Sequence, residues 1–174
     1  DPARAEVVAG NLNVMVALDG DAGKDRWVAH VELRGLTFRH AGREGQWRHF
    51  EGTAVRFKHG VRDCSVLDCR FADLGGCGVV IWKECVSNTV AGCEFTRTGD
   101  TCVKVFDYFG EGPPMSGGNR ILNNHIHHCG RDYFGAVGIT LGMVRDSVVA
   151  HNLVHDTAYS GIQWAGDSPG EPAF

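Results

Sequence analysis

Residues 76–81 of this chain read GCGVVI, and the same order of small, apolar, variable and apolar residues occurs four more times. The other copies are residues 52–57 (GTAVRF), 100–105 (DTCVKV), 136–141 (AVGITL) and 159–164 (YSGIQW). Val55, Val79 and Val103 in the first three copies are 24 residues apart. A fixed spacing of this length is typical of a solenoid whose coils stack on one another.

A second repeated segment precedes each of these copies. It comprises residues 33–38 (LRGLTF), 66–71 (VLDCRF), 90–95 (VAGCEF), 121–126 (ILNNHI) and 149–154 (VAHNLV). Both segments alternate apolar and polar residues with period two, and glycines interrupt every stretch that could carry a helical pattern. The sequence therefore predicts an all-β fold, a parallel β-helix solenoid of about five rungs with three short parallel sheets and almost no α-helix.

In such a coil, equivalent inward side chains stack in columns from rung to rung. Three columns are predicted: Val55, Val79, Val103, Ile139 and Ile162; Phe57, Ile81, Val105, Leu141 and Trp164; and Phe38, Phe71, Phe95, Ile126 and Val154. A further row, Leu36, Cys69, Cys93, Asn124 and Asn152, resembles an asparagine ladder at a bend. The cysteines and asparagines of this row are expected to fill the core and to satisfy backbone groups there.

Composition limits the classes of partner. The chain has 174 residues, 43% of them hydrophobic, and a net charge of −4 without a basic stripe, which favours one domain over residues 1–174 and argues against nucleic acid as a partner. No apolar run approaches the roughly 18 residues that span a membrane. Seven cysteines without CxxC pairs argue against a structural zinc site and against a fully paired disulfide framework. A monomer is expected.

The outward face of the GCGVVI-type strands is predicted to bind substrate. Alternation places Arg56, Trp82, Lys104, Phe106 and Gln163 on this face, and exposed aromatic rings beside polar donors suit sugars. Alternatively, residues 111–118 fold over the two aromatic side chains.

Two rows of ionisable residues flank this face. His40, Asp73, Arg97, His128 and Asp156 precede the strands, and Lys83, Glu84, Asp107, Tyr108 and Asp167 follow them. Hydrolysis of a glycosidic bond ordinarily needs two carboxyl groups that face each other. Asp107 opposite Asp132 or Asp156 is therefore the predicted catalytic pair, although turn aspartates often serve only to bind backbone N–H groups.

Histidines at positions 125, 127 and 128 resemble a metal-binding motif, but no second set of ligands accompanies them in the sequence, and no metal is predicted. His128 and His155 are instead candidates for hydrogen bonding to substrate.

Four segments of the chain resemble a known group of proteins. Residues 31–42 (VELRGLTFRHAG), 69–81 (CRFADLGGCGVVI), 123–141 (NNHIHHCGRDYFGAVGITL) and 151–163 (HNLVHDTAYSGIQ) are similar to bacterial right-handed β-helix proteins of the pectate-lyase-like superfamily. The nearest resemblance is to the group around glycoside hydrolase family 141, which contains fucosidase and xylanase activities. The resemblance implies a secreted or periplasmic enzyme that acts on polysaccharides, and a chain that is an excerpt of a longer protein, with the export signal outside it.

Three functions follow as alternatives. A glycoside hydrolase would use the carboxylate pair on a polysaccharide or oligosaccharide, without a cofactor. A polysaccharide lyase would use Lys104 or Arg56 as its base, with calcium or basic residues neutralising a uronate. A carbohydrate-binding solenoid would use Trp82 and Phe106 without any chemistry.

Overall fold

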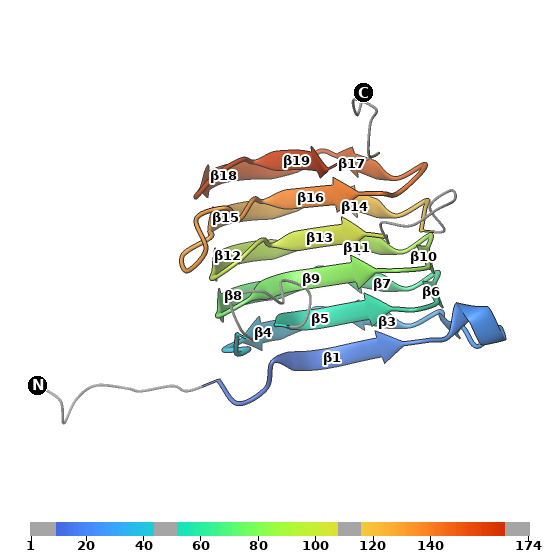
Figure 1. Cartoon of the computed structure of the whole chain (residues 1–174). Helices are drawn as coiled ribbons and strands as arrows, with labels where there is room; N and C mark the ends of the chain where they lie inside the picture. The colour runs from blue at the N-terminus through green and yellow to red at the C-terminus, as the bar shows by residue number, and fades with distance from the viewer. Residues whose placement is uncertain (1–9, 44–51, 108–115, 166–174) are drawn as a thin grey trace, which may run out of the picture.

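The strands coil into a stack of rungs, one above the other, with all sheet strands parallel (Figure 1). This architecture comes from a computed structural model, of which residues 10–43, 52–107 and 116–165 are described. In each rung the chain passes through a back sheet, then a side sheet, then a front sheet, and returns. The prediction of an all-β parallel solenoid of about five rungs is confirmed.

The front sheet, which faces the viewer in Figure 1, has six strands: β1 (Val14–Asp19), β5 (Thr53–Lys58), β9 (Cys77–Trp82), β13 (Val103–Phe106), β16 (Ile139–Gly142) and β19 (Ile162–Ala165). The side sheet has five: β4 (Thr37–Arg39), β8 (Arg70–Leu74), β12 (Glu94–Thr98), β15 (His125–Cys129) and β18 (Leu153–Thr157). The back sheet also has five: β3 (Glu32–Arg34), β7 (Ser65–Leu67), β11 (Thr89–Ala91), β14 (Arg120–Leu122) and β17 (Val148–Ala150).

Beyond the three predicted sheets, a small sheet of two-residue strands forms where the front strands turn towards the back. It consists of β2 (Val28–Ala29), β6 (Val61–Arg62) and β10 (Cys85–Val86). Within the described residues the one helical element is the 3-10 turn η2 (Ala22–Lys24), and no helix there is long and apolar enough to cross a membrane.

The predicted inward columns form the core. Val55, Val79 and Val103 are register partners in the front sheet and are fully buried. On the side sheet, the Phe71 ring stacks between those of Phe38 and Phe95, with centroids 4.9 and 4.5 Å away. Burial weakens at both ends of the described stack: the inward Val16 and Leu18 of β1 are partly buried, and Ile162 and Trp164 on the last described rung are 52% and 53% exposed.

Buried asparagines satisfy the backbone at two bends. At the bend from back to side sheet, Asn124 Oδ1 accepts the backbone N–H of Cys93, and Asn152 Oδ1 accepts the backbone N–H of Asn124, so the predicted ladder is confirmed there. Leu36, the first residue of that predicted row, is exposed instead. At the bend that leads into the back sheet, Asn88 and Asn119 form a second ladder that the sequence analysis did not identify.

All seven cysteines are buried and free, which agrees with the expected absence of a paired disulfide framework. Burial raises the pKa of the Cys77, Cys85 and Cys93 thiols to about 12, because a thiolate loses its hydration in the apolar core. These cysteines act as small core residues.

Candidate functional site

The predicted substrate-binding side chains of the front sheet fall into two outward rows. Arg56, Lys104 and Gln163 belong to one row, and Trp82 and Phe106 are register partners in the other. The prediction that the two aromatic residues lie on adjacent rungs is therefore confirmed. Their role in binding sugars stays a prediction.

Two basic residues of this face are already paired with carboxylates. The Lys104 ammonium lies 3.1 Å from Asp100 Oδ2, and Lys104 is only 6% exposed. Arg56 Nη2 lies 2.9 Å from Asp19 Oδ2. Each side chain is thus held in an ion pair, which argues against either of them as the catalytic base of a lyase.

The Trp82 ring has cations close to it. Lys58 Nζ lies 4.6 Å and Lys83 Nζ 5.1 Å from its centroid, both within the range of a cation–π interaction. A sugar that stacks on Trp82 therefore has to share the ring with these lysines.

The structure does not bring Asp107 together with Asp132 or Asp156. Asp107, at the end of β13, is 6% exposed, and its Oδ2 accepts the backbone N–H of Ser116. Asp132 lies beyond the other end of that strand, where its backbone N–H donates to Gly99 O. The four residues of β13 alone span about 13 Å, whereas the carboxyl groups of a glycosidase pair lie about 5–9.5 Å apart.

The row of residues that precedes the front strands has a common backbone conformation. His40, Asp73, Arg97, His128 and Asp156 all have positive φ, between 50° and 62°. A residue in this left-handed conformation interrupts the strand alternation, so that two consecutive side chains lie on the same side: Arg97 Nη1 is 3.4 Å from Thr96 Oγ1, and His128 Nδ1 is 2.7 Å from His127 Nδ1. Of the other predicted row, Tyr108 and Asp167 lie outside the described residues, as do residues 111–115 of the proposed covering loop.

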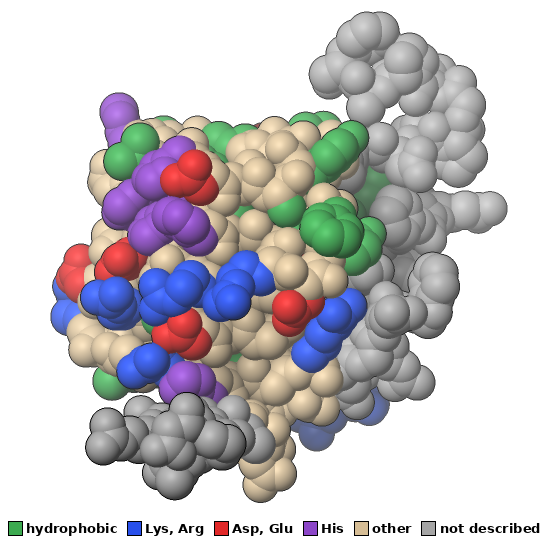
Figure 2. Space-filling view, turned by 90° about the vertical axis from the view of Figure 1, so that its left-hand side faces the viewer, with side chains coloured by type: hydrophobic (Ala, Val, Ile, Leu, Met, Phe, Trp, Pro, Cys, Tyr) green, Lys and Arg blue, Asp and Glu red, His purple; other side chains and the backbone are tan. Residues whose placement is uncertain are grey.

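The stacking of β15 on β18 gathers four imidazoles on the outer surface of the side sheet. We call His125, His127, His128 and His155 the histidine cluster. The ring centroids of His125 and His127 are 4.5 Å apart, and His155 stacks on His127 at 5.3 Å. Figure 2, which faces the side sheet, shows histidines gathered above a band of basic and carboxylate side chains.

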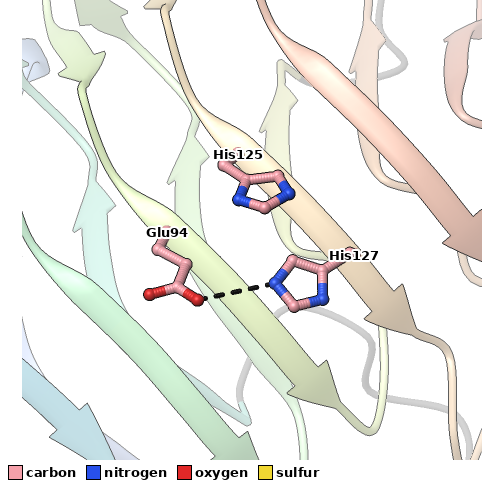
Figure 3. A group of neighbouring side chains, drawn as sticks. All are labelled: Glu94, His125 and His127. Carbon is pink, nitrogen blue, oxygen red and sulfur yellow. Dashed lines mark ion pairs between the residues drawn. The ribbon is translucent and has the colours of Figure 1, made fainter.

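Two carboxylates contact the histidine cluster from different sides. Glu94 Oε1 lies 3.5 Å from His127 Nε2, as the dashed line in Figure 3 marks. On the next rung, Asp156 Oδ2 lies 2.8 Å from His155 Nδ1 and 3.9 Å from His128 Nε2. The hydrogen bond with His155 lowers the pKa of the Asp156 carboxyl.

His127 is the least exposed imidazole of the cluster. Its side chain is 16% exposed, and its buried Nε2 makes no hydrogen bond of good geometry, because the contact with Glu94 Oε1 is long, at 3.5 Å. Its pKa is lowered, first because burial penalises the imidazolium form. Burial therefore favours the neutral form of this ring over the imidazolium form.

Glu94, His125 and His127 together offer ligand atoms that all lie within 4.8 Å of one another. The histidines are conspicuous in the sequence, but no second ligand set was predicted from it, because outward residues were aligned only for the front sheet. The pairing of β12 with β15, which sets Glu94 beside His125, supplies that second set. Aligning the outward positions of the side strands would have found it.

Parallel strands that stack in register, with buried columns and bend ladders, define a parallel β-helix protein. The family described as right handed beta helix region has a model that matches residues 53–170, more than half of the chain, and the chain belongs to this family. No curated protein gives a significant match, and no solved structure does either.

Proposed function

We propose that this chain is the β-helix domain of a secreted or periplasmic carbohydrate-active enzyme, a glycoside hydrolase related to the group around family 141. β-Helix scaffolds are common in carbohydrate-active enzymes, and here the outward rows of the front sheet carry the observation on which the proposal depends. Trp82 and Phe106 lie on adjacent rungs, and the exposed Gln163 lies two rungs further along. A polysaccharide that crosses the rungs would meet apolar and polar contacts in turn.

Of the three predicted carboxylates, Asp132 and Asp156 support this proposal and Asp107 does not. Asp132 and Asp156 are exposed; Asp132 lies in the segment that joins β15 to β16, and Asp156 lies near the end of β18, close to the turn towards β19. We assign these two residues to catalysis, with His128 as a hydrogen-bonding partner of the substrate. Asp107 is assigned a structural role, because its carboxylate binds the backbone N–H of Ser116.

The test is a screen of the purified chain against fucosylated oligosaccharides, xylan and pectin, with product analysis by mass spectrometry. Asp132→Asn and Asp156→Asn should each lower turnover by about 10²–10⁴-fold, because general acid or base catalysis is lost. Asp146→Asn is the matched control, since Asp146, like Asp156, is an exposed aspartate with positive φ, but it lies on another bend.

Each other outcome contradicts a defined part of the proposal. An unsaturated product that absorbs in the ultraviolet would indicate a lyase. Binding without product, abolished by Trp82→Ala, would indicate a non-catalytic solenoid. Turnover that both Asp variants retain would overturn the assignment of the carboxylates.

A further inference from the structure

We propose that Glu94, His125 and His127 form a binding site for a divalent transition-metal ion such as Zn²⁺. The site lies on the outer surface of the side sheet, and it does not depend on the proposed hydrolase activity.

The strand geometry brings the three ligands together. His125 and His127 are two residues apart on β15, so both side chains project to the same side. Glu94 on β12 is the register partner of His125. Because β12 and β15 are interior strands of a paired sheet, the ligands stand on a rigid support, as a metal site requires.

The spacing of the ligand atoms suits a metal ion. All three lie within 4.8 Å of one another, and His127 Nε2 lies 3.5 Å from Glu94 Oε1. Two ligands that bind zinc at about 2.1 Å in a tetrahedral arrangement are roughly 3.4 Å apart. The His127 and Glu94 pair therefore needs little movement to share an ion.

His127 Nε2 supplies an independent observation. It is buried, and its contact with Glu94 Oε1 at 3.5 Å lacks the geometry of a good hydrogen bond, although buried polar atoms in proteins are almost always satisfied. The other ring nitrogen, Nδ1, lies 3.3 Å from Thr96 Oγ1 and 2.7 Å from His128 Nδ1. Hydrogen bonding through Nδ1 leaves Nε2 as the nitrogen that faces Glu94.

In known metal sites, groups that hydrogen-bond to the ligands fix their orientation. Neighbouring side chains do the same here. Arg70 Nη1 lies 3.3 Å from Glu94 Oε2, which leaves Oε1 directed at His127. His125 Nε2 lies 2.9 Å from His155 Nε2, and the Nδ1 of His155 is bound to Asp156. The surrounding contacts thus fix both the carboxylate and the imidazoles.

The donor set selects the class of ion. Calcium and magnesium prefer oxygen ligands, whereas imidazole nitrogen suits zinc and its neighbours in the first transition row. Two histidines and one glutamate with an open position are a known zinc ligand set. The expected ion is therefore a transition metal and not calcium.

Titration of metal-free protein with Zn²⁺ in a calorimeter, and with Co²⁺ in a visible spectrometer, tests the site. We expect one Zn²⁺ per chain and Co²⁺ absorption bands without the thiolate charge-transfer band, since all seven cysteines are buried elsewhere. His127→Ala should weaken Zn²⁺ binding at least about 10–100-fold, the range found when groups around a metal site are altered.

Glu94→Gln provides a second variant of unchanged size in case His127→Ala does not fold, which circular dichroism would reveal. His59→Asn is the matched control, because His59 has positive φ and lies near Trp82, away from the site. Absence of Zn²⁺ binding to the wild-type chain would overturn the proposal. So would equal binding by the wild type and Glu94→Gln.

Discussion

Asn124 links three successive rungs through its side chain and backbone. Its Oδ1 accepts the backbone N–H of Cys93, and its Nδ2 donates to the carbonyl of Val90 and to Asn152 Oδ1. The residue is 2% exposed, so water cannot replace these bonds. At the residue scale, the solenoid depends on such side chains because each bend turns backbone groups away from the sheets.

Replacing this side chain should therefore be costly. Asn124→Ala leaves the Cys93 N–H and the Val90 carbonyl unsatisfied, and we expect a loss of about 2–4 kcal/mol in the free energy of unfolding, measured with urea. Asn123→Gly is the control, since position 123 has positive φ and the equivalent positions 35 and 92 are glycines. A loss equal to that of the control would show that the ladder contributes nothing.

At the scale of a structural element, the bend between side and front strands carries charges that stabilise it. Asp73 has φ of 53°, and its carboxylate receives Arg97 through two nitrogens, at 2.6 and 2.9 Å. Arg39 Nη2 lies 3.0 Å away on the previous rung. These hydrogen bonds hold the pKa of the Asp73 carboxyl well below its usual range, and those from Arg97 have the largest effect.

The low pKa of Asp73 predicts how stability depends on pH. The ion pairs of the folded state favour the ionised Asp73 carboxylate. Their contribution to the free energy of unfolding is therefore complete above the unfolded pKa of about 4 and declines as the pH falls below that value. Asp73→Asn, which tolerates the same φ, should lower the free energy of unfolding by about 1 kcal/mol at pH 7. In urea denaturation the difference from wild type should begin to shrink below about pH 4 and should vanish only once the pH falls below the depressed pKa of the folded state. An undiminished difference at pH 3 would contradict this explanation.

The sequence predicted correctly those parts of the molecule in which every rung is subject to the same packing constraint. Val79 and Phe95 were placed correctly because inward positions must be apolar and must stack. Outward positions lack that constraint, so the meeting of Glu94 with His127 follows only from the register of the side sheet. The predicted surface position of Asp107 was wrong. The alternation that predicted it ends with the strand, and there the carboxylate turns to the backbone N–H of Ser116.

At the scale of the whole molecule, a solenoid should tolerate the loss of a complete rung, because each rung contacts only its neighbours. Residues 52–75 and 76–99 are each one repeat of 24 residues, bounded by equivalent positions. Deleting either should preserve the β-sheet circular dichroism and cooperative unfolding, since Val103 then stacks on Val79 or directly on Val55. Deleting half a rung, residues 88–99, breaks the columns and should prevent folding.

The same two deletions separate the fold from the proposed metal site. Removal of 76–99 takes away Glu94, and Zn²⁺ binding should be lost from a folded chain. Removal of 52–75 keeps Glu94, His125 and His127 on adjacent strands but removes Arg70, so binding should persist with lower affinity. Calorimetric titration of both deletion variants measures this difference. Unfolding of both would show that the rungs are not interchangeable, and equal Zn²⁺ binding by both would show that Glu94 is not a ligand.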